Sequence, residues 1–311
     1  MVLVAVPDGT PAEAVAEAGA APAGGPDPLA RVPPLALVLT GIVSVQFGAA
    51  LAIGLFDDLG PAGTVLLRVV FGAVILTAVV RPRWRDYHRA DVPLVVAFGL
   101  TLGVMNLTFY EALDRIPLGI AVTIEFAGPL AVAVIGSRRP LDLLWVVLAG
   151  GGIVLLADPF GTGEAVDHLG LAFAAIAGVC WAMYIVLAAR AGPRFRGADG
   201  VALAMLVAAL VPIGPGIAEG GSALLSIDVL AIGAAVGLLS TAIPYTLETE
   251  ALRRIPRHVF SVLMSLEPAV AALAGFVVIG QDLHVREVVA IALVVIASAG
   301  ASRNAAALPD A

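Results

Sequence analysis

Four ionisable residues lie inside long apolar stretches of this sequence, namely Arg68, Glu125, Glu248 and Glu267. A charge within an apolar helix is costly in lipid, so such residues usually mark a binding site, a proton relay or an ion pair. A guanidinium binds carboxylates, and a buried carboxyl can hold an ammonium group or a proton. Together the four residues could bind a zwitterion such as an amino acid. The alternative is a permanent pair between Arg68 and a glutamate that only joins two helices.

Two of the glutamates lie deep in their apolar stretches. Glu125 comes eight residues after Pro117, which places it about 12 Å along a helix that starts there. Glu267 is similarly deep, so the two carboxylates could face the same space. Glu248 lies closer to one end of its stretch, and Glu250 lies closer still, so both could simply be in contact with solvent.

Uncharged polar and aromatic residues in the same stretches are further candidates for a binding site. They are Gln46, Asn106, Tyr110, Trp181, Tyr184, Thr241 and Tyr245. Each of these residue types more often packs between helices than contacts a ligand. Pro129, Pro244 and Pro268 interrupt the helices and free carbonyl groups, which could line a cavity or merely accompany a kink.

Several kinds of chemistry are excluded by residues that the sequence lacks. All 17 basic residues are arginine, so neither a P-loop lysine nor a lysine Schiff base can form. Cys180 is the only cysteine, which excludes an intramolecular disulfide and a thiolate metal cluster. No two histidines have the i, i+4 spacing of a helical zinc site. We therefore expect no metal, no cofactor and no enzymatic activity.

The composition is that of a membrane protein. Hydrophobic residues make up 60% of the 311 residues and charged residues 13%, and the mean hydropathy is +1.02. Soluble domains are roughly half apolar and about a quarter charged. The net charge of -7 comes from acids that cluster in alternate loops. We expect the lipid bilayer, and no nucleic acid, to be a partner of this chain.

Ten apolar stretches are long enough to be transmembrane helices. They cover residues 35–56, 61–80, 92–113, 116–136, 141–157, 168–189, 200–218, 228–251, 257–280 and 285–302. Within them, Gly99-xxx-Gly103 and Gly233-xxx-Gly237 predict close helix packing. Residues 1–32, rich in Ala, Pro and Gly, predict a disordered cytoplasmic tail, and residues 304–311 predict a second tail. The fold class is therefore an all-α integral membrane protein with ten transmembrane helices.

The loops between the stretches alternate in charge. Arginines crowd every second loop and flank both tails, whereas the opposite loops contain two arginines, Arg115 and Arg286, among ten acidic residues. Arginine-rich loops stay on the cytoplasmic side. We therefore expect a multi-pass protein of the cytoplasmic (inner) membrane with both termini in the cytoplasm.

A repeat relates the two halves of the chain. The heptapeptide Glu111–Pro117 recurs as Glu250–Pro256, 139 residues later, with six identical positions. Pro129 matches Pro268 at the same offset. Apolar helices often resemble one another by chance, but a charged heptapeptide with a proline in register does not arise so easily. The sequence therefore indicates a duplication.

The duplication predicts two repeats of five helices each, at residues 33–158 and 159–303. Because five is odd, the second repeat must cross the membrane in the opposite direction to the first. Inverted repeats of this kind are typical of alternating-access transporters, in which two halves rock about a site near the middle of the bilayer.

The sequence resembles the drug/metabolite transporter superfamily, in its EamA-type branch, and within that branch the threonine/homoserine exporters. The resemblance is most specific over residues 117–150, with the motif IEFAGP around Glu125, and over residues 240–275, with the motif SLEP around Glu267. Weaker matches extend it to nearly everything from residue 35 to residue 302.

The resemblance implies ten helices in two inverted repeats and proton-linked efflux of small neutral amino acids such as threonine and homoserine. The candidates on matching positions are Arg68, Asn106, Tyr110, Glu125, Trp181, Tyr184, Glu248 and Glu267. Glu250 departs from the apolar residue of the family, and the Ala/Pro-rich tail has no counterpart there. A homodimer is an open alternative to a monomer.

Two other functions fit the same pattern. The same fold could export another metabolite or a drug, because one scaffold serves many substrates. A channel or a scaffold protein would need no buried charges in both halves, so the buried glutamates favour a transporter.

Overall fold

The computed structural model describes residues 32–83, 87–135, 140–157, 167–191, 194–195, 198–252, 254–255, 260 and 263–305. The chain divides into two units, Met1–Pro33 and Pro34–Ala311, and every helix given below belongs to the second unit. The described residues form helices joined by short connections and contain no β-strand. The predicted tail at residues 1–32 lies outside the described residues except for Val32.

The first half of the chain forms helices that follow the hydropathy closely. They are α2 (Pro34–Ile53), α3 (Phe56–Val80), α4 (Val92–Leu113), α5 (Leu118–Glu125), α6 (Ala127–Ile135) and α7 (Pro140–Ala157). A 3-10 turn, Arg89–Asp91, precedes α4. The bounds of α4 are those predicted, whereas the predicted span 116–136 is broken at Phe126 into α5 and α6.

The second half contains more interruptions. Its α-helices are α8 (His168–Ala191), α9 (Asp199–Ala208), α10 (Ile213–Gly220), α11 (Ile227–Gly237), α12 (Ile243–Leu252), α14 (Glu267–Ala274) and α15 (Val285–Ala305). A 3-10 turn, η4 (Gly221–Leu225), follows α10, and two π-helices, η5 (Leu238–Ala242) and η6 (Gly275–Ile279), follow α11 and α14. The predicted span 257–280 begins outside the described residues.

Five of the described helices are long and apolar enough to cross a membrane. The bent pair α9 and α10, with an angle of 52° between its parts, makes a sixth when it is taken as one span. Shorter apolar helices occupy Leu118–Val132, Leu144–Leu155 and Glu267–Ile279. The all-helical, membrane-spanning character predicted from the sequence is confirmed, while the count of ten spans and the inversion of the repeats stay predictions.

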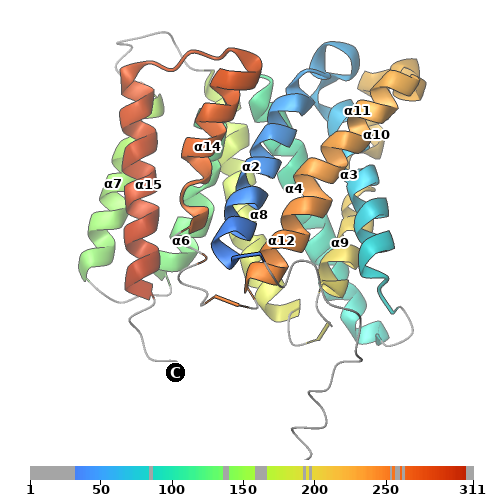
Figure 1. Cartoon of the computed structure of the whole chain (residues 1–311), viewed down its shortest axis with the longest axis horizontal. Coiled ribbons are helices and arrows are strands. Elements are labelled where there is room, and N and C mark those ends of the chain that lie inside the picture. The colour runs from blue at the N-terminus through green and yellow to red at the C-terminus, as the bar shows by residue number, and fades with distance from the viewer. Residues whose placement is uncertain are drawn as a thin grey trace, which may run out of the picture. The chain divides into compact units, whose positions relative to one another are not determined.

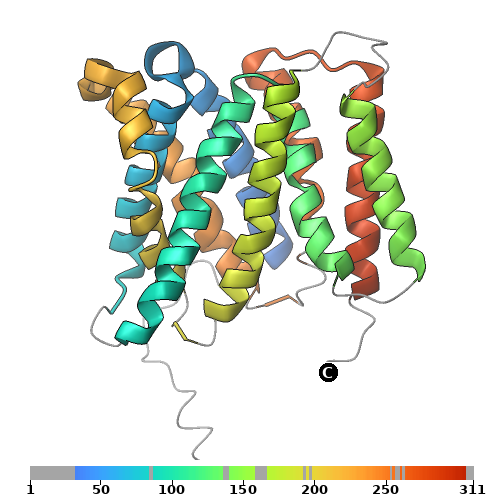
Figure 2. The ribbon, with the colours of Figure 1, turned by 180° about the vertical axis from the view of Figure 1, so that it is seen from behind.

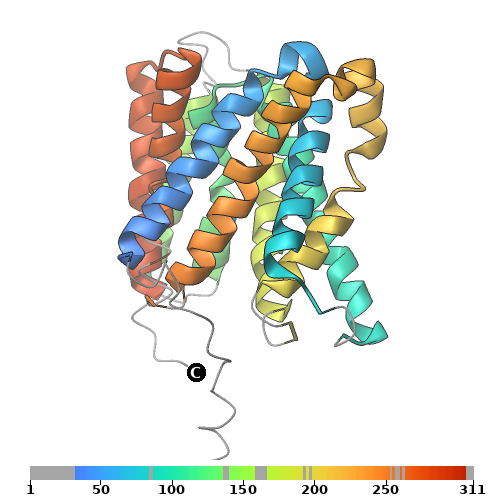
Figure 3. The same ribbon diagram turned by 45° about the vertical axis from the view of Figure 1, so that its right-hand side comes forward.

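Helices from the two halves of the chain are interleaved, as Figures 1 and 2 show from opposite sides. α4 lies against α8 and α9, and α3 lies against α10 and α11. α2 runs beside α12, which Figure 3 shows most clearly, and it also contacts α14. α7 packs on α15. Three helices of the first half therefore meet the interrupted helices of the second half.

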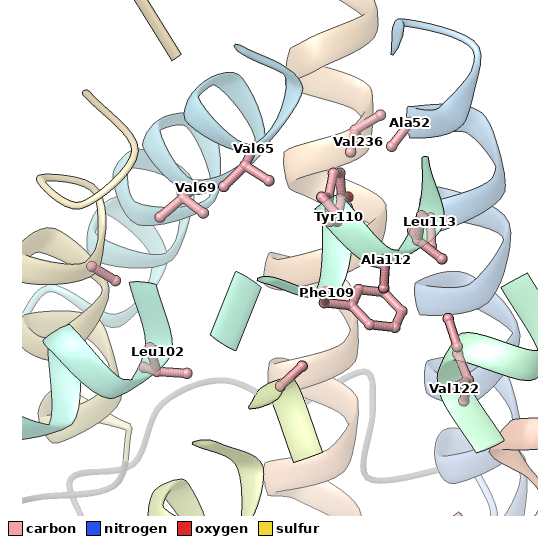
Figure 4. Packing of buried hydrophobic residues seen from close by; sticks show 14 of the residues in the cluster. Ala52, Val65, Val69, Leu102, Phe109, Tyr110, Ala112, Leu113, Val122 and Val236 are labelled. Atoms are coloured by element: carbon pink, nitrogen blue, oxygen red, sulfur yellow. The ribbon is translucent and has the colours of Figure 1, made fainter. Parts of the chain in front are cut away.

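The buried core is made of small and branched side chains around a few aromatic rings. Tyr110 of α4 is fully buried within it, and Figure 4 shows this ring close to Val236 of α11 and Ala52 of α2. Val65 and Val69 bring α3 into the same cluster. The cluster thus joins α2, α3, α4 and α11 around Tyr110.

Glycines set the close approach of these helices. A Cβ atom added at Gly99 would lie 2.5 Å from the Ala204 carbonyl oxygen, and one at Gly103 would lie 2.5 Å from a methyl group of Val211. α4 can therefore approach the α9 region only because both positions are glycine. The close packing predicted from the spacing of these residues is confirmed.

The start of α3 is kinked. Gly60 has φ 65° and ψ 170°, and Pro61 follows it. The Ala62 N–H, which the kink leaves without a helical acceptor, donates to Glu219 Oε2 of α10 at 2.9 Å. Because Glu219 caps α3 from the other half of the chain, α3 and α10 are held together at this end.

Candidate functional site

Arg68 lies on α3 and faces η5 and α4. Its Nη2 donates to the Ser240 carbonyl oxygen at 3.3 Å, and its guanidinium carbon lies 5.1 Å from the centroid of the Tyr110 ring. Arg68 Nε and the Tyr110 hydroxyl are buried, and each lacks a well-aligned hydrogen-bond partner among the described residues. Arg68 can therefore still donate to a further group.

The permanent ion pair considered from the sequence is not formed at Arg68. The salt bridges between described residues join Arg115 to Glu111 and Asp114, and Arg254 to Glu250. Among the described carboxylates, none lies within salt-bridge distance of Arg68. Its guanidinium instead contacts a neutral carbonyl and an aromatic face, which stabilise it without neutralising its charge.

The two deepest glutamates lie where helices are interrupted. Glu125 is the last residue of α5, just before the break at Phe126, and is 7% exposed. Glu267 is the first residue of α14, next to Pro268, and is 5% exposed. Interrupted helices in transporters commonly carry the binding site. The positions of these breaks therefore favour the two glutamates as site residues.

Glu248 lies on α12 and faces α2. A Cβ atom added at Gly41 of α2 would lie 3.6 Å from Glu248 Cγ and 3.7 Å from Glu248 Oε1. Glu248 is partly buried rather than solvent-exposed, and its neighbour Glu250 pairs with Arg254 near the end of the helix. Glu248 therefore packs against a neighbouring helix, whereas Glu250 forms an ion pair within its own helix end.

The charges of these groups act on one another inside the protein. The Arg68 charge acts on the Glu125 carboxyl, and Glu267 interacts electrostatically with both Glu125 and Glu248. Within the described part of the chain, none of the three carboxylates takes part in a hydrogen bond or a salt bridge. One positive and three acidic groups are thus linked by electrostatic interactions within the protein, and among the three carboxyl groups the Arg68 charge acts on that of Glu125.

Two tyrosines predicted from the sequence lie near Glu248. The Glu248 charge acts on both Tyr184 of α8 and Tyr245 of α12. The Tyr184 ring also packs on Phe98, with 5.3 Å between the ring centroids. These tyrosines place aromatic surface and hydroxyl groups beside the acidic side of the site.

Three other predicted residues have mainly packing contacts. Trp181 stacks edge-on against Phe126, with 5.2 Å between the ring centroids, and so touches the break that follows Glu125. Asn106 is buried, and its Nδ2 donates to the Leu102 carbonyl of its own helix at 2.8 Å. Gln46 is buried on α2, and its side chain forms no hydrogen bond to the described residues.

Comparison with known proteins identifies the family. Residues 168–303 match the model of the EamA-like transporter family. The threonine/homoserine exporter RhtA of Escherichia coli strain K12 is 42% identical over 282 residues, which cover 89% of this chain and 95% of that protein. The chain belongs to the EamA-like transporter family. Its 60% hydrophobic composition and its apolar helices are those of a multi-pass membrane protein.

A second relative and a solved structure are also similar to this chain. The threonine/homoserine exporter RhtA of Salmonella typhimurium strain LT2 is 43% identical over 271 residues, covering 86% of this chain and 91% of that protein. A solved crystal structure with 22% sequence identity superimposes with a TM-score of 0.60 over 88% of this chain and 99% of that chain. The latter likeness shows a shared fold.

Sequence reasoning missed the groups that hold the Arg68 of this EamA-like transporter. The group that accepts a hydrogen bond from Arg68 is the main-chain carbonyl of Ser240. The neighbouring carbonyl, that of Leu239, accepts a hydrogen bond of 2.7 Å from Ser44 Oγ. The available signal was Pro244, which the sequence predicts to free a carbonyl four residues earlier. That carbonyl belongs to Ser240.

Proposed function

We propose that this protein exports small neutral amino acids such as threonine and homoserine across the cytoplasmic membrane. The observation that carries the proposal is an Arg68 guanidinium that contacts the Ser240 carbonyl and the Tyr110 ring and has no carboxylate partner among the described residues, while its charge acts on Glu125. The two relatives that share 42% and 43% identity over most of this chain carry the name threonine/homoserine exporter. They support the choice of substrate.

The arrangement suits a zwitterion. An amino acid carries its carboxylate and its ammonium group on one carbon atom, so it needs a cation and an anion of the protein close together. Arg68 offers N–H groups to the carboxylate, and Glu125 offers an oxygen to the ammonium group. The aromatic face of Tyr110 borders Arg68, and Trp181 packs against Phe126, the residue that follows Glu125. Substrate binding thereby gives each of the two groups an oppositely charged partner, which the described residues do not supply.

The remaining two glutamates are suited to coupling. Glu248 and Glu267 repel each other when both are ionised, and the interior supplies neither with a cation among the described residues. A carboxyl in such a place gains by holding a proton. We assign the proton that drives export to this pair, and the substrate ammonium group to Glu125.

Ten transmembrane helices in two inverted repeats, residues 33–158 and 159–303, form part of the proposal. The repeated heptapeptide supports it, because Arg115 Nη1 pairs with Glu111 Oε2 at 2.9 Å and, at the equivalent positions, Arg254 pairs with Glu250. The helix breaks also correspond. Phe126 interrupts the first repeat, and the turn at Ser265, 139 residues later, interrupts the second.

Both chain ends are proposed to be cytoplasmic. Figure 1 shows α2 beginning and α15 ending at the same end of the bundle. α3, α8 and α12 also end there, and arginines lie at or just after each of these ends: Arg81 and Arg83, Arg190 and Arg194, and Arg254. Arginine-rich connections at one end support a cytoplasmic location for that end.

The proposal is tested by efflux of radiolabelled threonine and homoserine from preloaded cells that express equal amounts of each variant. We expect export by the wild type and its loss in Glu125→Gln and Arg68→Ala. Gly151→Ala is the matched control, because a Cβ atom there meets nothing within 4 Å. A folded wild-type protein that exports neither amino acid would overturn the substrate assignment and leave another metabolite or a drug as the cargo of this fold.

A further inference from the structure

The carbonyl that binds Arg68 is available because the helix around it is irregular in two ways. In η5, the Ile243 N–H bonds to Leu238 O, five residues back, and not to Leu239 O as in an α-helix. The next residue is Pro244, which has no N–H and so offers nothing to Ser240 O. Two consecutive carbonyls therefore lose their α-helical donors.

Side chains from the first half of the chain replace those donors. Ser44 Oγ of α2 bonds to Leu239 O at 2.7 Å, and Arg68 Nη2 of α3 bonds to Ser240 O at 3.3 Å. Buried carbonyls are nearly always hydrogen-bonded, so the carbonyls of Leu239 and Ser240 each require a donor from elsewhere in the protein. The Ser240 carbonyl accepts one N–H of the Arg68 guanidinium, whose other N–H groups remain available.

α2 and α3 also hold η5 at close range. A Cβ atom added at Gly48 would lie 2.9 Å from Leu239 Cβ and 3.2 Å from Ser240 N. One added at Gly72 would lie 2.8 Å from Thr241 Oγ1. A Cβ atom added at Gly237, the residue before η5, would lie 2.9 Å from Gly72 N and 3.1 Å from Arg68 O. Because these contacts leave little room for adjustment, the Ser240 carbonyl has a set position relative to the helix that carries Arg68.

We infer that the Ser240 carbonyl is a positioning group, which holds Arg68 away from Glu125 so that both side chains remain open to a ligand. In a low-dielectric interior a guanidinium and a carboxylate attract each other strongly, and a direct pair would occupy the two groups at once. The Arg68 charge acts on the Glu125 carboxyl, but the two side chains do not form a salt bridge. The identity of the ligand as an amino acid rests on the proposed function, but the positioning of Arg68 does not.

Restoring the missing N–H provides the test. In Pro244→Ala the new N–H competes with Arg68 for the Ser240 carbonyl, and the released guanidinium is expected to pair with Glu125. The matched control is Pro215→Ala, since Pro215 is an exposed residue in the first turn of α10, where an N–H has no helical partner to gain.

The readout is chemical labelling of purified full-length protein in lipid nanodiscs with dicyclohexylcarbodiimide. This apolar reagent modifies carboxyl groups that are free to take up a proton inside membranes, whereas a carboxylate held in an ion pair stays ionised and does not react. Mass spectrometry quantifies the label at Glu125, Glu248 and Glu267 separately. The last two serve as internal standards, because neither is expected to pair with the released Arg68.

We expect Pro244→Ala to lower the label at Glu125 about fivefold relative to the two internal standards, which is the shift produced by one hydrogen bond of about 1 kcal/mol. Pro215→Ala should leave the ratio unchanged. Gly72→Ala, which pushes η5 from α3 without adding a donor, should change the ratio in the same direction and keeps the inference testable if Pro244→Ala does not fold.

Three results would overturn the inference. They are a label at Glu125 that is equal in the wild type and the folded variants, a wild-type Glu125 that is already protected, and a uniform loss of label at all three glutamates. Binding of radiolabelled threonine by the same samples separates this test from the proposed function. A protein that labels as expected but does not bind threonine contradicts the substrate assignment and leaves the positioning of Arg68 intact.

Discussion

Replacing Arg68 by lysine keeps the positive charge and removes the shape of the guanidinium. In the structure this group donates from Nη2 to Ser240 O at 3.3 Å, lies over Tyr110 with 5.1 Å from its carbon to the ring centroid, and has an unoccupied Nε. An ammonium group is a compact point charge that lacks the planar fork. It cannot face the carbonyl, the ring and a substrate carboxylate together, so Arg68→Lys loses at least one bond to the substrate.

The size of the effect follows from that lost bond. A hydrogen bond to a charged group contributes about 1.5–3 kcal/mol. Its loss should weaken threonine binding about 10- to 150-fold. The rate of export at saturating threonine should change less, because Glu248 and Glu267 remain in place. The measurements are binding of radiolabelled threonine to purified protein and initial efflux rates over a range of internal threonine concentrations.

Arg81→Lys is the control for this prediction. Arg81 is exposed at the end of α3, where its Nε donates to Ala78 O at 3.3 Å, so its replacement should leave threonine binding unchanged. A folded Arg68→Lys protein with wild-type threonine affinity would refute the argument from guanidinium geometry. An equal loss in Arg81→Lys would show that the effect is not specific to the site.

Three further changes test packing, capping and coupling. Gly103→Leu inserts a side chain where a Cβ atom would already lie 2.5 Å from a methyl group of Val211. This overpacking should lower the free energy of unfolding by about 1–3 kcal/mol and so lower the thermal midpoint of the purified protein. An unchanged midpoint would contradict the close packing. Glu219→Ala removes the acceptor of the Ala62 N–H and should lower the free energy of unfolding by about 1 kcal/mol in thermal unfolding, whereas Glu219→Gln should lose less. Glu267→Gln should abolish net export driven by a pH gradient in liposomes while threonine exchange continues, and loss of both would argue against a proton carrier.

The residue ranges of the helices were largely predictable, because a long apolar stretch in a membrane protein forms a helix that spans the bilayer. The predicted range 92–113 is the observed range of α4, and 285–302 lies within α15. The interruptions were not predictable in the same way. The π-turn η5 and the bend between α9 and α10 depend on which helix lies alongside, and hydropathy contains no information about that.

The candidate site was predictable where it consists of charged side chains. Arg68, Glu125 and Glu267 stand out in the sequence because lipid-embedded charges are rare, and in the structure the Arg68 charge acts on the Glu125 carboxyl. The Ser240 carbonyl could not be found in this way, because every residue has a carbonyl. Only the missing N–H of Pro244 pointed to it, and the donor that uses this carbonyl comes from a helix 172 residues earlier in the sequence.

The central claim is that Arg68 and Glu125 together bind a zwitterion, and competition for radiolabelled threonine on the purified wild-type protein tests it most directly. The competitors are homoserine, threonine methyl ester, which lacks the carboxylate, and the corresponding hydroxy acid, which lacks the ammonium group. We predict that homoserine displaces threonine and that neither singly charged analogue does so at comparable concentrations. Displacement by the methyl ester or the hydroxy acid as effectively as by homoserine would contradict the claim.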